Sequence, residues 1–131
     1  MRKKLSRVDG VLEDGLPWGG ELVVYPLAGT RMGEALFFHA VSETLIVTDL
    51  VFHYGRSDFR GLARLFMGLN GALEGFGPTR LARWLFFADK RTLAASMKPV
   101  LDLDIRAVIM SHGQVVERDG GQKMREALPG G

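Results

Sequence analysis

The chain has 131 residues, of which 47% are hydrophobic and 24% are charged, so it is expected to fold as one domain with its own hydrophobic core. The formal net charge is only +2, which is too small for the dense basic stripe that binds nucleic acid. The absence of cysteine excludes disulfides, thiolate metal sites and cysteine nucleophiles.

Targeting signals are also missing from the sequence. No apolar run approaches the roughly 20 residues that a membrane-spanning helix needs. The basic N-terminal residues Arg2, Lys3, Lys4 and Arg7 are followed by Val8-Asp9-Gly10 rather than by an apolar stretch, which argues against a signal peptide. We therefore predict a cytoplasmic protein with a solvated N-terminal end and with neither membrane nor nucleic acid as a partner.

Three strands are predicted in the first half of the chain. Turn-forming residues predict an irregular lead-in over residues 1–20, with at most a short strand near Val11-Leu12. Strands are predicted over Glu21–Pro26, Glu34–His39 and Thr44–Leu50. The connection between the last two has hairpin length, so they are expected to pair antiparallel. Leu45-Ile-Val47 is apolar throughout, which is typical of a strand covered on both faces.

The hydrophobic period then changes to that of helices. Apolar residues from Phe59 to Leu73 recur every three or four positions, which predicts an amphipathic helix that ends at the turn Gly75–Pro78. A second helix is predicted from Thr79 to Ala88. A third begins after the N-cap Asp89 and runs toward Val100, with Pro99 expected to kink or end it.

The C-terminal part returns to a strand pattern. Ile105–Ser111 reads as a buried strand that His112-Gly113 closes, and Gln122–Leu128 as a short helix. Three strands, a helical block, one strand and a small helix predict a layered α/β (α+β) domain with a mixed sheet and helices packed on one face.

The residues that can carry chemistry follow the ends of predicted strands. The three histidines are His39, His53 and His112, and Asp49 lies in the same turn region as His53. A carboxylate and an imidazole brought together at the carboxyl ends of strands are able to share a Zn, Fe or Mn ion. From spacing alone, Asp49 as a turn or cap residue and His112-Gly113 as a plain turn remain the alternative.

Two of these segments resemble the metallo-β-lactamase-fold superfamily. Thr44-Leu-Ile-Val-Thr-Asp-Leu50 resembles the segment in which a buried strand ends in the Asp that bridges two metals, and Ala107-Val-Ile-Met-Ser-His-Gly113 resembles the strand that ends in the last metal-binding His. Their separation of 63 residues (112 − 49), filled by helices, also fits. With Trp18-Gly-Gly-Glu-Leu and Ala35-Leu-Phe-Phe-His39, the likeness is closest to an uncharacterised branch of that superfamily and covers the chain from about Leu12 onward.

The resemblance implies a metal site with Asp49 and His112 as ligands. The superfamily's H-x-H-x-D-H cluster does not occur here, and the loop Gly29–Gly33, where a further histidine would fall, contains none. His39 and His53 match no ligand position. We therefore expect residues 1–131 to form a single metallo-β-lactamase-like domain that lacks the N-terminal His-cluster half, with an incomplete site for Zn (or Fe or Mn) and no catalysis by this chain alone.

Other sites are less favoured. The loop Gly29–Gly33 lacks the glycine-lysine pattern of a phosphate loop, and no G-x-S-x-G elbow occurs for a serine nucleophile. The segment Trp84–Phe87 is predicted to be core or a face for the missing half. Four arginines are expected on the polar sides of two helices, with anion recognition as the alternative: Arg60, Arg64, Arg80 and Arg83.

A half-domain of this kind is expected to hide its apolar surface by self-association, as a homo-oligomer and most simply a dimer. The alternative function is a non-catalytic, self-associating α/β interaction module in which Asp49 and His112 serve as turn and cap. In a third arrangement, a partner chain supplies the missing histidines and completes the metal site.

Overall fold

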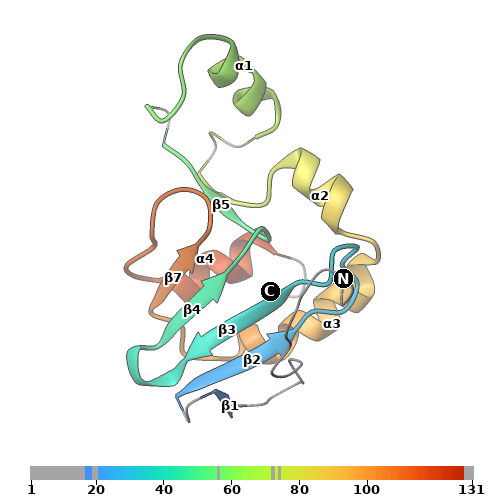
Figure 1. Cartoon of the computed structure of the whole chain (residues 1–131), viewed down its shortest axis with the longest axis vertical. Coiled ribbons are helices and arrows are strands. Elements are labelled where there is room, and N and C mark those ends of the chain that lie inside the picture. Colours follow the sequence, from blue (N-terminus) through green and yellow to red (C-terminus); the bar gives the residue numbers. More distant parts are fainter. Residues whose placement is uncertain (1–16, 19–20, 56, 72, 74, 129–131) are drawn as a thin grey trace, which may run out of the picture.

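A mixed sheet forms the centre of the protein. The computed structural model describes residues 17–18, 21–55, 57–71, 73 and 75–128, so the N-terminal basic cluster and the strand expected near Val11-Leu12 lie outside the described residues. The five strands of this sheet have the order β1-β2-β3-β4-β7 (Figure 1). They are β1 (Pro17–Trp18), β2 (Leu22–Pro26), β3 (Ala35–His39), β4 (Thr44–Val47) and β7 (Ala107–Met110).

Among the described residues, the other elements are four α-helices, a short 3-10 helix and a second, two-stranded sheet of β5 with β6. The helices are α1 (Gly61–Leu69), α2 (Arg80–Phe86), α3 (Lys90–Leu101) and α4 (Gly120–Ala127), with the 3-10 helix at Ala40–Ser42. The small strands are β5 (Phe52–His53) and β6 (Phe76–Gly77). The predicted combination of a mixed sheet with helices is therefore confirmed.

The direction of the strands follows from the lengths of their connections. Strands β1 to β4 pair antiparallel in sequence order, and the predicted hairpin between β3 and β4 is confirmed. Strand β7 pairs with β4 in parallel. A parallel pair needs a long crossover connection, and the predicted helical block supplies it.

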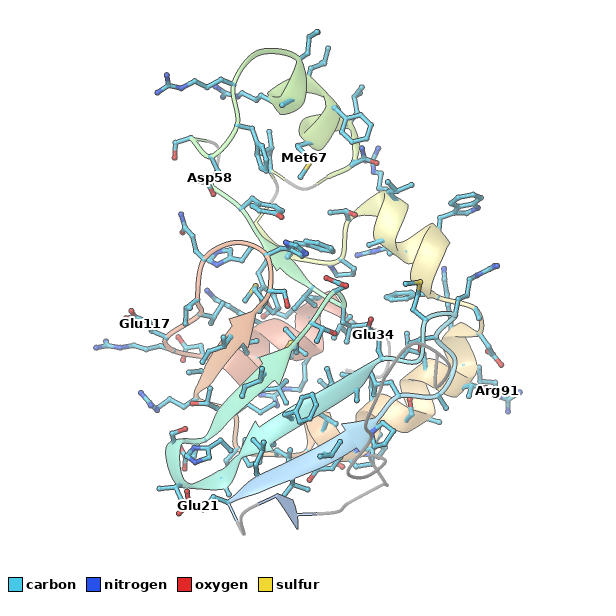
Figure 2. The ribbon with its side chains drawn as sticks, viewed as in Figure 1. Glu21, Glu34, Asp58, Met67, Arg91 and Glu117 are labelled. Atoms are coloured by element: carbon cyan, nitrogen blue, oxygen red, sulfur yellow. The ribbon has the colours of Figure 1, made fainter. Side chains whose placement is uncertain are left out.

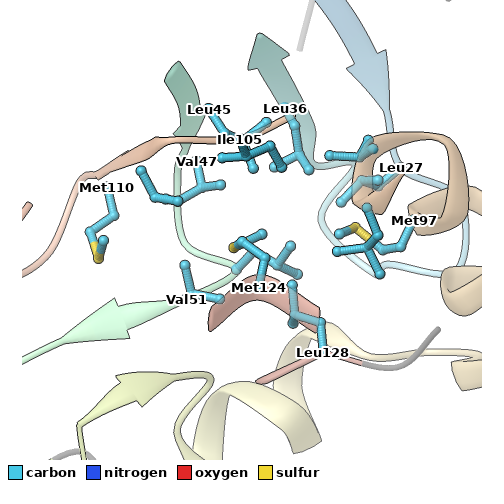
Figure 3. Close-up of a cluster of buried hydrophobic side chains, with 14 of the residues drawn as sticks. Leu27, Leu36, Leu45, Val47, Val51, Met97, Ile105, Met110, Met124 and Leu128 are labelled. Atoms are coloured by element: carbon cyan, nitrogen blue, oxygen red, sulfur yellow. The ribbon is translucent and has the colours of Figure 1, made fainter. Parts of the chain in front are cut away.

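The hydrophobic core lies between one face of the sheet and two helices. Alternate residues of the strands point to the same face, and Leu36, Leu45 and Val108 are fully buried on it. Helix α3 contributes Met97 and α4 contributes Met124 to the same cluster (Figure 3). Burial of side chains of this size stabilises the fold by about 1.5–3 kcal/mol each.

Strand β4 is shorter than the sequence predicted. A strand was expected over Thr44–Leu50, but β4 ends at Val47. The chain leaves the sheet there because Leu50 and Val51 turn into the core, where both are buried. Thr48 and Asp49 thus form the outer side of the bend that follows the strand.

Helix α1 forms where the period predicts it, but it packs differently from the other helices. It lies at the end of the molecule away from β1 and has no buried residue (Figure 1). Leu62 is 85% exposed and Trp84 of α2 is 72% exposed. Of the segment Trp84–Phe87, expected to be core or a face for the missing half, Phe87 lies in the core and Trp84 does not. The apolar pattern predicted the helices correctly and did not say what would cover them.

Helix α3 begins at the predicted N-cap. The carboxylate of Asp89 accepts hydrogen bonds from the amides of Arg91 and Thr92. Pro99 does not end the helix, which continues for two residues beyond it to Leu101. The loop before β3 is anchored to this helix start, because the carbonyl of Gly29 accepts bonds from the Ala88 and Asp89 amides. Gly29 has a φ of +79°, and an added Cβ would lie 2.5 Å from the Asp89 carbonyl oxygen, so this loop has a structural role.

No helix in the described part of the chain is long and apolar enough to cross a membrane.

Candidate functional site

The register of the parallel strand pair brings Asp49 and His112 together. In that pair Leu45 lies opposite Val108, and Val47 lies opposite Met110. Asp49 and His112 each follow by two residues, so continuing the same register places them opposite one another. Their side chains meet, with 3.1 Å between Asp49 Oδ1 and His112 Nε2.

Both side chains of this Asp49–His112 pair are accessible to solvent. The Asp49 side chain is 41% exposed and that of His112 is 50% exposed. An ion pair that exposed contributes at most about 1 kcal/mol to folding, because water screens the charges. The fold therefore does not depend on this pair for its stability, and the pair remains open to a ligand.

The backbone behind His112 is held by strand β5. The amide of His53 donates to the His112 carbonyl at 3.4 Å, and the amide of Gln114 donates to the His53 carbonyl at 2.7 Å. Gly113 lies between these bonds with a φ of +103°, and an added Cβ would come within 2.2 Å of the His53 carbonyl oxygen. Only glycine fits, and this explains the His-Gly sequence that closes the strand.

A series of aromatic rings in mutual contact begins at the imidazole of His112. The ring of Phe52 stacks on it, with centroids 5.6 Å apart and an interplanar angle of 15°. Tyr54 stacks in turn on Phe52 at 6.1 Å, and Phe59 meets Tyr54 edge-on at 4.9 Å. Such contacts restrict the orientation of each ring, so the imidazole of His112 is oriented from its face as well as from its backbone.

The pKa of Tyr54 is shifted by its surroundings. Partial burial raises the pKa of the Tyr54 phenol above its ordinary value of 10.0, and the nearby carboxylates of Asp49 and Asp58 raise it further. The Tyr54 hydroxyl consequently keeps its proton at neutral pH.

Glu34 is a residue of this edge that the sequence reasoning did not identify. Glu34 directly precedes β3, and Thr48 directly follows β4, the strand paired with β3. The Glu34 carboxylate accepts a hydrogen bond from the Thr48 hydroxyl. Antiparallel pairing of the predicted Glu34–His39 and Thr44–Leu50 strands was the signal that pointed to Glu34.

The other two histidines lie outside the pair. His39 ends β3 at the opposite edge of the sheet, where Nδ1 is 2.7 Å from Ser42 Oγ and Nε2 is 3.3 Å from Glu21 Oε2. His53 lies near His112 in the backbone, but its Nδ1 is 2.9 Å from the Gln114 carbonyl oxygen, so that nitrogen carries a proton and donates. The sequence assigned neither histidine to a ligand position.

The donor atoms of the Asp49–His112 pair suit a divalent metal ion. Zinc binds carboxylate oxygen and imidazole nitrogen at about 2.0–2.2 Å, so two donors of a tetrahedral site lie about 3.3–3.6 Å apart. The observed 3.1 Å comes within a few tenths of an ångström of that separation. No group of three or more His, Cys, Asp or Glu residues is placed to hold a metal ion within the described ranges.

Comparisons with known proteins leave this geometry as the basis for assigning a function. No protein-family model matches the chain, and no curated protein matches it.

Proposed function

We propose that the protein is related to the metallo-β-lactamase-fold hydrolases and that Asp49 and His112 are two ligands of a metal site that this chain alone leaves incomplete. The observation that carries the proposal is the approach of Asp49 Oδ1 to His112 Nε2 at the ends of adjacent parallel strands. Short resemblances to the superfamily around both residues agree with it. The ion is Zn, or Fe or Mn, which take the same oxygen and nitrogen donors.

Two protein ligands are fewer than the three that hold a catalytic zinc ion. When bound, a metal ion supplies a water of lowered pKa for hydrolysis. Asp49 and His112 bind and orient the ion in this proposal, and the stacked Phe52 keeps the imidazole in position. A partner chain that adds one or two histidines would complete the site, so this chain is proposed to have no independent catalysis.

Zinc titration of the purified chain tests the proposal. Isothermal calorimetry is expected to give one zinc ion per chain, with binding lost in an Asp49→Ala, His112→Ala double variant. His39→Ala is the matched control, because it removes an imidazole paired with a carboxylate at the other edge of the sheet. Zinc binding that survives the double variant, or that disappears in His39→Ala, contradicts the assignment.

A second candidate function, a self-associating interaction module, is favoured by the face of the sheet opposite the core. Four apolar residues are in register across four strands and form an apolar row: Val24, Phe37, Ile46 and Ile109. Within this row Ile109 is 42% exposed and Phe37 and Ile46 are partly exposed, whereas Val24 is already buried in the single chain, so the open part of the row lies on β3, β4 and β7. A sheet face in contact with water usually carries polar residues, so an apolar row is typical of a face that another layer covers.

The occupant proposed for this face is a second copy of the chain. Light scattering coupled to size-exclusion chromatography is expected to give a dimer, and Ile109→Lys is expected to shift it toward monomer. Val115→Lys is the control, because Val115 is also exposed but lies outside the row. A monomer of 14.4 kDa for the wild-type chain rejects self-association and leaves the metal-site proposal standing.

A further inference from the structure

An apolar pocket lies next to the Asp49–His112 pair. It has a volume of about 240 Å³, and its walls come from β5, the residue after it, and helices α1 and α2. The apolar lining residues are Phe52, Tyr54, Phe66, Met67, Leu81 and Ala82. Met67 points from α1 back toward β5 (Figure 2).

The pocket and the pair share a wall. Phe52 lines the pocket and stacks on the imidazole of His112. Tyr54 also lines it and is near enough to Asp49 for that carboxylate to raise its pKa. A molecule in the pocket is therefore in contact with residues that touch the pair or lie close to it.

Two polar side chains of the wall, Asn70 and Thr79, each make a hydrogen bond within the protein. Asn70 Nδ2 donates to the Phe66 carbonyl at 2.9 Å, and Thr79 Oγ1 accepts from the Ala82 amide at 3.0 Å. These bonds hold the side chains to their own helices. The pocket thus presents mainly rings, a thioether and aliphatic groups, which bind apolar groups through dispersion and ring contacts.

The volume limits the size of the ligand. Sites for drug-sized molecules measure about 300–1,000 Å³. An apolar cavity of about 150 Å³ is large enough for benzene. The pocket therefore has room for a single aromatic ring or a short acyl chain, and the rest of the ligand must extend out of it.

We propose that the pocket holds the aromatic ring of a small carboxylic acid or of its ester, and that the polar end of this ligand reaches the Asp49–His112 pair. This inference rests on the proposed metal site, because a carboxylate needs a cation at the pair, where Asp49 alone would repel it. An aromatic ring is preferred to an acyl chain because three of the lining side chains are themselves aromatic. The ligand places its apolar part against α1 and α2 and so gives the exposed side chains of Phe66 and Leu81 a partner.

A larger hollow on α1, lined by Gly61, Leu65 and Leu69 among others, does not meet these conditions. None of its lining residues stacks on or pairs with Asp49 or His112. It serves as the alternative position for a ring in the test.

The test uses two fluorinated probes, observed by fluorine NMR on the full chain. Fluorobenzene, which has no polar end, is expected to bind the wild-type protein weakly and independently of zinc. Leu81→Trp fills the pocket and is expected to weaken binding about tenfold, as changes in apolar pockets do. Leu62→Trp is the matched control, because it adds the same ring to an exposed helix position outside the pocket. Both positions are exposed, so neither variant is expected to disturb folding.

The second probe, 4-fluorobenzoate, tests the link to the pair. Zinc is expected to strengthen its binding to the wild-type protein about tenfold or more and to have no effect in Asp49→Ala. Equal fluorobenzene binding in Leu81→Trp, or loss of binding in Leu62→Trp, overturns the pocket assignment. If fluorobenzene binds in the pocket but zinc does not change the binding of 4-fluorobenzoate, the proposal that a ligand reaches from the pocket to the Asp49–His112 pair is overturned. Failure of zinc to bind in calorimetry is the separate result that rejects the metal site.

Discussion

Two imidazole–carboxylate pairs lie at opposite edges of the sheet. Their nitrogen–oxygen distances are similar, but their surroundings differ. His112 and Asp49 are 3.1 Å apart at the edge where β4 and β7 end, and His39 and Glu21 are 3.3 Å apart at the other edge. Figure 2 shows Glu21 at this second edge and Glu34 at the first. The distance between an imidazole and a carboxylate therefore does not by itself distinguish a ligand site from a structural contact.

The hydrogen bonds around each pair make the distinction. His39 is tied to Ser42 through its other nitrogen, Ser42 donates to Thr44 at 2.9 Å, and Thr44 is buried. This network closes the hairpin between β3 and β4. His112 instead has a ring on its face and solvent at its side, which leaves its pair with Asp49 available for an ion.

The largest expected effect concerns the backbone behind His112. Gly113→Ala forces a Cβ to within 2.2 Å of the His53 carbonyl oxygen at a φ of +103°. Strain and overpacking together are expected to lower the free energy of unfolding by about 3 kcal/mol in urea titrations. Gly33→Ala is the control, since Gly33 also has a positive φ but has no atom within 4 Å of an added Cβ. Equal losses in the two variants would show that strain alone acts and that His53 does not press on this turn.

The next largest expected effect is stabilisation by zinc, which distinguishes the His112 pair from the His39 pair. If the proposed site binds zinc, free zinc at a hundredfold excess over its Kd raises the free energy of unfolding by about 2.7 kcal/mol. This increase is expected in wild-type protein and in His39→Ala, and it is expected to vanish in His112→Ala. Thermal or urea unfolding with and without zinc measures it. An increase that persists in His112→Ala would place the ion elsewhere.

Without metal, His39→Ala is expected to destabilise the protein more than His112→Ala does. His39→Ala removes the bonds to Ser42 and Glu21 and is expected to cost about 1 kcal/mol of unfolding free energy. His112→Ala removes an exposed ion pair and is expected to cost less than about 0.5 kcal/mol. Urea titrations in the presence of a chelator compare the two. A larger loss for His112→Ala would make that pair a structural contact.

The smallest expected effect is on the pH dependence of stability. It concerns Asp89, whose carboxylate caps helix α3. The side-chain bond from Thr92, followed by the amide bonds from Thr92 and Arg91, lowers the pKa of Asp89 below its ordinary 3.8. A lowered pKa in the folded state adds stability above the ordinary value, and this stability is lost as the pH falls through the folded pKa. Asp89→Asn keeps a capping oxygen but does not titrate, so its stability is expected to fall slightly less than that of the wild type between about pH 5 and about pH 2. An identical pH dependence in both proteins would show that ionisation of the Asp89 carboxyl does not contribute to stability.

Much of this arrangement was predictable from the sequence because it depends on local patterns. Short apolar runs bounded by turn residues predicted β2, β3, β4 and β7, and the ends of the last two predicted that Asp49 and His112 would be neighbours. The hairpin length predicted the antiparallel pairing of β3 and β4.

Other features were not predictable because they depend on contacts between distant segments. Strand β5 has two residues, which is too few for a period to be read, and its partner β6 lies in what the sequence presented as a turn. The stacking of Phe52 on His112 joins positions far apart in the chain and leaves no mark in either local pattern. Trp84 was expected in the core or on a face for the missing half because its apolarity is visible in the sequence, whereas its exposure is visible only in the fold.

The parallel register of β4 and β7 has a consequence for engineering. The β4–β7 pairing and the bonds from β5 together hold Asp49 beside His112, so only the part of the crossover between β5 and β6 works as a spacer. Helix α1 buries none of its residues, so peptide sequences inserted at or near it are expected to leave the geometry of the pair unchanged. A reporter or binding peptide placed there would lie beside the pocket, and it would have to spare Phe66 and Met67, the α1 residues that line it.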